Sequence, residues 1–262
     1  MKRNSKAGFT LIELLVVVAI LTLIMGVVFK QVNNVQKMSR NEDTKLDLTQ
    51  EGREFVDVFI RDVHQAGYPG AAMYAPGAVG TPAANDSRVA VGLVKFARDE
   101  VWFEADVNGD GSVDSVDYKL QPDANGNCPC KISRSQVSKA NGTAPMSQTR
   151  SYSIELQDVI NSGGANGGAS GTAAYTISGG SGGGASNDAL YTEYKPANVF
   201  TALDVAGNEV GPADYSTTAG QTALKTIKTI RINVNLLGRN IDMQTGRRAV
   251  IPLAATSDVG NN

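Results

Sequence analysis

The strongest constraint on this chain is an apolar run near its beginning. From Phe9 to Phe29 the 21 residues are almost all apolar, and the cations Lys2, Arg3 and Lys6 precede them. A helix of this length reaches roughly 30 Å, the thickness of the hydrocarbon core of a bilayer. Cations beside a membrane segment favour the cytoplasmic side. The sequence therefore predicts one membrane-spanning helix, with its N-terminus in the cytoplasm and the bulk of the chain outside.

Glu13 is the one ionisable side chain inside this run. A carboxylate at that depth costs a few kcal/mol even on lenient insertion scales, so its presence indicates a function and a cationic partner. The run itself contains no cation. We therefore expect the partner of Glu13 to come from another molecule.

The residues around Glu13 carry a resemblance to a known family. They read Gly8-Phe9-Thr10-Leu11-Ile12-Glu13-Leu14-Leu15-Val16. This stretch resembles the prepilin signature of type IV pilins and type II secretion pseudopilins. The resemblance implies that a membrane peptidase cuts after Gly8 and that Phe9 becomes an N-methylated N-terminus. It also implies that Glu13 pairs with the amine of a neighbouring subunit as the helices pack into a filament.

An ordinary signal peptide and a plain single-pass anchor are the alternatives. A signal peptide carries its small-residue cleavage site after the apolar core, whereas Ala7 and Gly8 precede the core here. A plain anchor gives no reason for Glu13. Both alternatives therefore explain less than the prepilin interpretation.

The resemblance also implies where the chain acts. Residues 1–8 are expected to be a leader peptide, and residues 9–29 to cross the inner membrane before they enter the core of a cell-surface pilus. The implied partners are the prepilin peptidase, the inner-membrane assembly platform, membrane lipid, and other minor and major pilins.

Charge and cysteine content narrow the remaining possibilities. Removal of the leader cations lowers the formal net charge from −2 to −5, and no basic run lies elsewhere in the chain. Nucleic acid is therefore not an expected partner. Two cysteines in an exported chain predict one disulfide, because that side of the membrane is oxidising.

A helix is predicted to continue through residues 30–68. Its first part is mostly polar, and then Phe55, Phe59 and Val63 recur at four-residue steps, which indicates a stripe that packs on a sheet. The charged residues expected to face away from that sheet are Arg53, Asp57, Arg61 and Asp62. One long helix from about Phe9 to about Ala66 follows, with a flexible hinge around Asn33-Asn34 as the alternative.

The second half of this helix carries a further resemblance. Leu46–Arg53, Phe59–Val63 and Ala66–Tyr68 resemble PilW-type minor pilins, in which an Arg-Asp pair is followed by Ala-Gly-Tyr. J-type minor pseudopilins of type II secretion are a close alternative. Gly67 to Gly70 then ends the helix, since Gly suits the cap and Pro69 cannot continue it.

Residues 69–262 are predicted to form an antiparallel β-sheet domain outside the membrane. Strand patterns occur at 88–97, 99–105, 116–120, 151–158, 227–237 and 249–253. The stretch 227–237 is expected to be a central strand against the helical stripe. Residues 71–88 read as a surface loop, and residues 163–184, with ten Gly in 22 positions, as a flexible insertion. The predicted fold class is α+β, a long helix packed on an antiparallel sheet with loop insertions.

The stretch from Asp106 to Asp117 resembles a twelve-residue calcium loop. Oxygen-bearing residues stand at its ligand positions, namely Asp106, Asn108, Asp110, Ser112, Asp114 and Asp117. Calcium takes six to eight oxygens, and the glycine at position 6, Gly111, permits the turn that brings them together. Asp117 replaces the usual Glu at position 12. The alternatives are a structural Ca²⁺ site and a tight hairpin turn, where Asn, Asp and Gly are common for conformational reasons.

Cys128 and Cys130 are separated by one proline. A disulfide between them closes only a small ring, and a metal pair needs additional ligands. The only histidine, His64, lies far away in the sequence. We expect the local disulfide.

No catalytic set is recognisable, because His64 has no neighbouring nucleophile in a known motif. We expect a non-enzymatic filament subunit. The resemblance implies a minor pilin that assists the initiation of type IV pilus assembly and lies at or near the tip. The alternatives are a J-type minor pseudopilin of type II secretion and a calcium-dependent adhesin module displayed on a pilus. No residues in the sequence support a third alternative, an anchored periplasmic enzyme.

Overall fold

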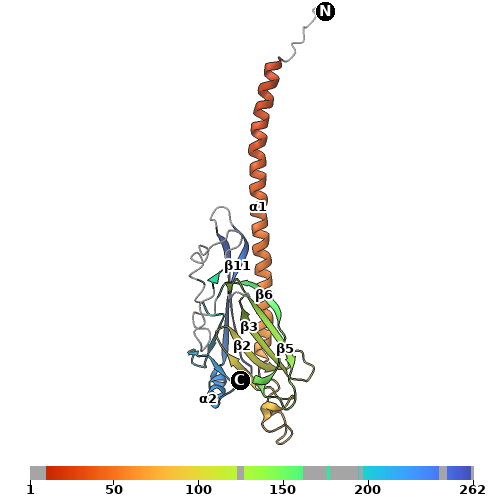
Figure 1. Cartoon of the computed structure of the whole chain (residues 1–262), viewed down its shortest axis with the longest axis vertical. Coiled ribbons are helices and arrows are strands. Elements are labelled where there is room, and N and C mark those ends of the chain that lie inside the picture. The colour runs from red at the N-terminus through yellow and green to blue at the C-terminus, as the bar shows by residue number, and fades with distance from the viewer. Residues whose placement is uncertain are drawn as a thin grey trace, which may run out of the picture. The chain divides into compact units, whose positions relative to one another are not determined.

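The computed structural model describes residues 10–122, 127–161, 176–177, 194, 197–241 and 247–260. The chain divides into two compact units, Met1–Thr44 and Lys45–Asn262. Helix α1, Leu11–His64, has residues in both units (Figure 1). Its backbone is helical at Asn33 and Asn34, the place where a flexible hinge was the alternative prediction from the sequence.

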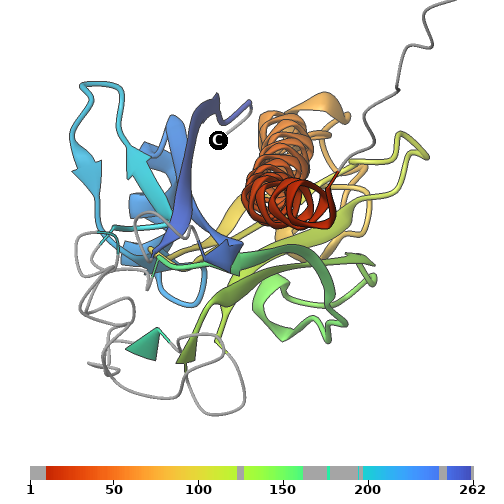
Figure 2. The ribbon, with the colours of Figure 1, turned by 90° about the horizontal axis from the view of Figure 1, so that it is seen from above.

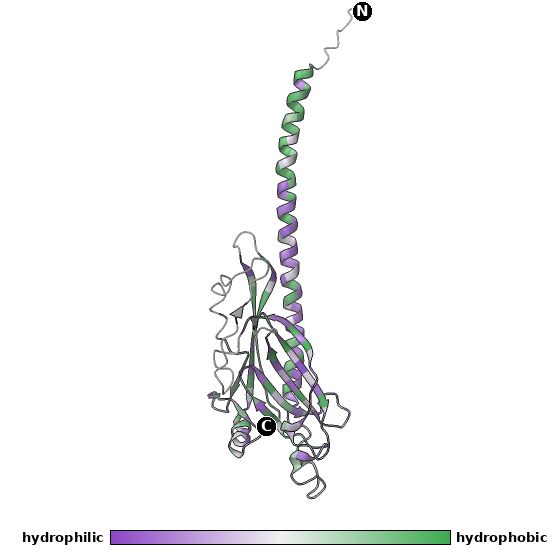
Figure 3. Ribbon diagram, viewed as in Figure 1, coloured by the Kyte–Doolittle hydropathy of each residue, from purple (hydrophilic) through white to green (hydrophobic). Residues whose placement is uncertain are grey.

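In the first unit, α1 is apolar up to Phe29 and largely polar beyond it (Figure 3). The large apolar side chains from Leu11 to Phe29 are exposed, with relative accessibilities from 48% at Val28 to 82% at Leu11. The helix is long and apolar enough to cross a bilayer. So much exposed apolar surface is unfavourable in water, so this stretch requires lipid or other helices around it.

Among the described residues of the second unit, ten strands form one sheet in the spatial order β10-β1-β2-β3-β5-β6-β11-β8-β9, with β12 paired to β11. Every pair within it is antiparallel. The strands are β1 Gly92–Phe96, β2 Glu100–Ala105, β3 Asp114–Gln121, β5 Cys130–Ser138, β6 Ser153–Val159, β8 Phe200–Leu203, β9 Glu209–Val210, β10 Ala213–Asp214, β11 Thr229–Ile241 and β12 Arg248–Asp258.

The remaining elements are short. Strands β4, Asn127–Cys128, and β7, Thr176–Ile177, form a separate parallel pair. Helix α2 covers Thr218–Thr226, and its start is capped by Thr217, whose side chain accepts a hydrogen bond from the Gly220 amide. Three single 3₁₀ turns are η1 Ala71–Met73, η2 Ala83–Asn85 and η3 Pro145–Ser147.

The part of α1 that belongs to the second unit packs against the large sheet. Phe55, Phe59 and Val63 are buried, and the Phe59 ring centroid lies 5.1 Å from that of Tyr118 and 5.4 Å from that of Phe200. Viewed from above, the strands curve around the orange part of the helix (Figure 2). Each such buried side chain contributes about 1.5–3 kcal/mol. The predicted stripe and the α+β fold are thus confirmed.

Gly52 allows the helix to approach the sheet closely. A Cβ atom at this position would overlap Leu253 Cδ1 and lie 2.9 Å from Leu236 Cδ1. Glycine inside a helix costs about 1 kcal/mol relative to alanine, and the contact with β11 and β12 offsets that cost. The predicted strand 227–237 is therefore confirmed as an interior strand against α1.

The other strand predictions are confirmed with shifted ends. The strand predicted from Arg88 begins only at Gly92, because the residues before it belong to the loop around Asp86. Sequence patterns missed β5, β8 and α2. In β5 the serines Ser133 and Ser135 are buried, so an apolar alternation is not visible there.

Candidate functional site

Glu13 lies in the first turn of α1, where its carboxylate closes a capping box with Thr10. Glu13 Oε2 accepts hydrogen bonds from the Thr10 amide at 2.8 Å and from the Thr10 hydroxyl at 3.0 Å. The Glu13 amide donates to Thr10 Oγ1 at 3.4 Å. This reciprocal pairing satisfies donors that a helix start otherwise leaves free. The Thr-x-x-Glu spacing is the local sequence signal of this cap.

No cation of the described part of the first unit can reach Glu13. The first one along the helix is Lys30, 17 positions further, which is about 25 Å at the rise of an α-helix. A negative charge in an apolar surface favours a positive partner nearby. That this partner comes from another molecule stays a prediction. Gly8 and Phe9, the predicted cleavage and methylation residues, lie outside the described residues, so their roles stay predictions.

Asp62 was predicted from the sequence to face away from the sheet, and this prediction is wrong. Its side chain is only 4% exposed and forms an ion pair of 2.7 Å between Asp62 Oδ2 and Arg134 Nη2. The Tyr118 hydroxyl also donates to Asp62 Oδ2 at 2.7 Å. Burial and the nearby carboxylate raise the pKa of the Tyr118 phenol well above its usual range. The expectation failed because Arg134 on β5 gives the carboxylate a partner within the core.

The Asp-rich loop connects β2 to β3 and is organised by its own backbone. Asp106 Oδ1 accepts a hydrogen bond from the Gly109 amide at 2.8 Å, and Asp106 Oδ2 accepts one from the Gly111 amide at 3.0 Å. Asp110 Oδ1 accepts from the Ser112 amide at 2.8 Å. Gly111 has φ +84°, a conformation that favours glycine. These bonds are those of a tight turn.

The last two predicted calcium ligands belong to β3. Asp114 accepts hydrogen bonds from Gln136 and Ser138 on β5. Asp117 is fully buried and is bound instead by Arg150 at 3.0 Å and by the Tyr152 hydroxyl at 2.6 Å. The structure therefore does not bring all six predicted ligands together. Among the described residues no group of three or more His, Cys, Asp or Glu side chains is arranged to hold a metal ion. Calcium binding stays a prediction, carried by the loop residues.

The calcium hypothesis predicts a measurable heat when CaCl₂ is titrated into the detergent-solubilised full chain. At a calcium concentration one hundred times the Kd, binding stabilises the folded state by about 2.7 kcal/mol and raises the melting temperature. Asp106→Asn should abolish both effects, while Asp57→Asn, at an exposed helix position, should leave them unchanged. A titration without heat, together with an unchanged melting temperature, ends the hypothesis.

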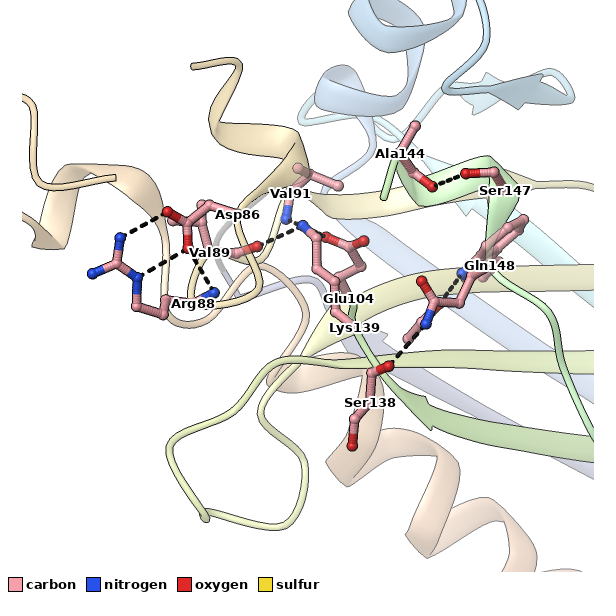
Figure 4. Close-up of polar contacts among 12 residues, drawn as sticks. Asp86, Arg88, Val89, Val91, Glu104, Ser138, Lys139, Ala144, Ser147 and Gln148 are labelled. Carbon is pink, nitrogen blue, oxygen red and sulfur yellow. Dashed lines mark hydrogen bonds and ion pairs between the residues drawn. The ribbon is translucent and has the colours of Figure 1, made fainter. Parts of the chain in front are cut away.

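A buried ion pair holds the loop between α1 and β1 to the sheet (Figure 4). Lys139 Nζ lies 2.6 Å from Glu104 Oε2 and donates to the Val89 carbonyl at 2.8 Å. The Val91 amide donates to the same Glu104 oxygen at 3.2 Å. Both charged side chains are almost fully buried, and burial raises the pKa of Glu104. The sequence gives no local sign of this pair, because its members are 35 residues apart.

Asp86 organises the same loop internally (Figure 4). It accepts hydrogen bonds from the Gly80 amide at 2.7 Å, the Arg88 amide at 2.9 Å and the Arg88 guanidinium at 2.8 Å. The Arg88 hydrogen bonds hold the pKa of this carboxyl well below its usual range. The predicted surface loop is therefore an ordered element joined to the end of the sheet.

The two cysteines, Cys128 and Cys130, form a disulfide in the structure.

Asn161, near this disulfide, is fully buried. Its Oδ1 accepts from the Asn235 amide at 2.6 Å, and its Nδ2 donates to the Asn233 carbonyl at 3.0 Å. Asn161 thus fills the place where β11 changes its neighbour from β8 to β6. Sequence reasoning missed this residue, since nothing local marks it.

Comparison with known proteins gives a match at the N-terminal part of the chain. The model of the prokaryotic N-terminal methylation motif matches residues 3–29. No curated protein matches the chain. The motif supports a protein of pilin or pseudopilin type, and in general terms it implies contact with other pilins and with the prepilin peptidase. Together with the apolar helix it is consistent with membrane anchoring before incorporation into a filament.

Proposed function

We propose that this chain is a minor pilin, a non-enzymatic subunit that assists the initiation of type IV pilus assembly and lies at or near the filament tip. The observation that carries the proposal is Glu13. It is an acidic side chain in an exposed apolar helix surface, its described contacts are those to Thr10, and no described cation of its own unit is within reach. The N-terminal amine of a neighbouring subunit, created by cleavage before Phe9, supplies the missing charge.

The architecture supports a subunit rather than a free-standing domain. The apolar surface of α1 from Leu11 to Phe29 suits lipid before assembly and neighbouring helices afterwards. The second unit is a separate folded sheet domain that the same helix carries. When the helix moves from lipid into a bundle of like helices, Glu13 gains a positive partner and the apolar surface keeps apolar surroundings.

The assignment as a minor pilin rests on the resemblance of residues 46–68 to PilW-type chains. A J-type minor pseudopilin of type II secretion is the second candidate, because the methylation motif at residues 3–29 is common to both kinds of subunit. The two differ in the filament that contains the chain. A strain lacking one system at a time separates them, since the chain is recovered only with the filament that it serves.

Intact-mass spectrometry of the full chain, isolated from membranes and from sheared filaments, tests the proposal. We expect a mass that begins at an N-methylated Phe9 and is present in the sheared fraction. Membranes from a strain without prepilin peptidase provide the control, in which the mass should include residues 1–8. An uncut chain confined to the membrane, in a strain with a working peptidase, would reduce residues 9–29 to an anchor and overturn the proposal.

A further inference from the structure

Among the residues that the structure describes, strand β12 forms a free edge of the large sheet. It pairs with β11 through nine successive positions, from Thr229 opposite Asp258 to Leu237 opposite Val250. Over the ranges that the structure covers, no strand pairs with its other edge. A long, regular edge presents unpaired N–H and C=O groups on which another strand can add.

The hydrogen bonds of Asn235 fix which way Pro252 points. Asn235 is opposite Pro252, but its amide donates to Asn161 Oδ1 and its carbonyl accepts from the Ile160 amide. Both polar groups of Asn235 are therefore directed away from β12. In an antiparallel ladder the opposite residue then also directs its backbone groups away from its partner. Pro252 consequently places its ring nitrogen, which has no hydrogen, at the free edge.

The same argument places Ala254 on the outer edge. Asn233, opposite Ala254, uses its amide on the Val199 carbonyl and its own carbonyl on Asn161. Thr256 follows by alternation. The side chains of Pro252, Ala254 and Thr256 are exposed, in contrast to the half-buried Leu253 between them. The free edge therefore offers backbone donors at Ala254 and Thr256, and lacks one at Pro252.

The local sequence is an independent sign that this edge needs protection. Residues 249–256 read Ala-Val-Ile-Pro-Leu-Ala-Ala-Thr and contain no charge. Short uncharged segments rich in β-forming residues pair with copies of themselves when they are exposed and contain no proline. Here the charged residues Arg248 and Asp258 stand at the two ends of the strand, and Pro252 stands within the uncharged segment.

We propose that Pro252 prevents the free edge of β12 from pairing with β12 of a second copy of this chain. A proline on an edge strand, with its nitrogen facing outward, removes one ladder hydrogen bond and places its ring where an approaching strand would lie. It leaves the β11–β12 ladder intact, because that ladder does not use the position. Preventing this strand pairing matters when copies of the chain are concentrated in a membrane or a filament. The inference about Pro252 does not depend on which filament contains the chain.

The test replaces Pro252 with Thr in the full chain, solubilised in detergent at one protein per micelle. Sedimentation velocity should show concentration-dependent dimers and larger species for Pro252→Thr, at concentrations where the unchanged chain remains monomeric. The control is the double variant Pro252→Thr/Thr256→Pro, which has the same composition. It moves the proline to another outward-facing position of the same edge, and we expect it to be monomeric again.

Trp102 fluorescence, from the single tryptophan of the chain, verifies that each variant is folded. Should Pro252→Thr fail to fold, Pro252→Ala restores the N–H without a branched side chain and should associate in the same way. A folded Pro252→Thr or Pro252→Ala chain that remains monomeric would contradict the proposal. A double variant that associates as strongly as Pro252→Thr would contradict it as well, since an outward-facing proline on this edge would then fail to prevent pairing.

Discussion

Replacing Glu13 with Ala is expected to remove this chain from sheared filaments while leaving it processed and in the membrane. Alanine should enter the bilayer more easily than the carboxylate does. The subunit then lacks the proposed charge-assisted hydrogen bond to the amine of a neighbouring subunit, and such a bond contributes about 1.5–3 kcal/mol. A loss of about 2 kcal/mol lowers the incorporated fraction roughly thirtyfold. Quantitative mass spectrometry of the sheared fraction, normalised to the major subunit, measures the effect.

Glu54→Ala provides the matched control, because Glu54 is an exposed glutamate of the same helix whose side chain accepts a hydrogen bond from Gln50 one turn away. It should be incorporated like the unchanged chain. Intact mass should show N-methylated Phe9 in both variants, which separates an assembly defect from a processing defect. Filaments that contain Glu13→Ala at the level of Glu54→Ala would disprove the assembly role of Glu13.

Replacing Asp62 with Ala is expected to cause a large loss of stability in the second unit. The substitution leaves the guanidinium of Arg134 largely buried, at 17% side-chain exposure, without its counter-charge. It also removes the acceptor of the Tyr118 hydroxyl. Breaking a buried ion pair from one side costs about 3–5 kcal/mol, which for a unit of this size lowers the melting temperature by roughly 10 °C. Thermal unfolding followed by Trp102 fluorescence reports on this unit, because Trp102 is buried in its sheet.

Asp57→Ala changes an exposed carboxylate on the same helix and should alter the free energy of unfolding by about 0.5 kcal/mol or less. A second comparison uses Asp62→Leu/Arg134→Met, which removes both charges together. Apolar replacement of a whole buried pair is often neutral or stabilising, so this double variant should melt above Asp62→Ala. Equal melting temperatures for Asp62→Ala and Asp57→Ala would show that the ion pair does not hold helix and sheet together.

The strongest predictions from sequence concerned features that a short stretch of chain defines by itself. The apolar run from Leu11 to Phe29 is helical and exposed, and the stripe Phe55, Phe59 and Val63 is buried against the sheet. Both patterns follow from helical periodicity and the partition of apolar side chains away from water. The strands with regular apolar alternation were found for the same reason, and the methylation motif is read directly from residues 3–29.

Predictions failed where a polar side chain found its partner far along the chain. Asp62 was assigned to solvent because its own helix shows a charged residue beside an apolar stripe. Arg134, 72 residues later, reverses that assignment. Asp117 stands at position 12 of the predicted calcium loop, and in the structure its carboxylate is bound by Arg150 and Tyr152; its role as a calcium ligand stays a prediction. No local pattern contains the identity of a distant partner.

The sequence by itself determined a membrane-length helix with one carboxylate, a helix stripe made to pack on strands, and an α+β chain. Only the tertiary structure decided the direction of each backbone N–H and the partner of each buried charge. Pro252 illustrates the difference. Its identity is visible in the sequence, whereas the outward direction of its ring nitrogen follows from the hydrogen bonds of Asn235 to Asn161 and Ile160. Periodicity is a property of neighbours along the chain, whereas register and charge pairing are properties of segments that meet only after folding.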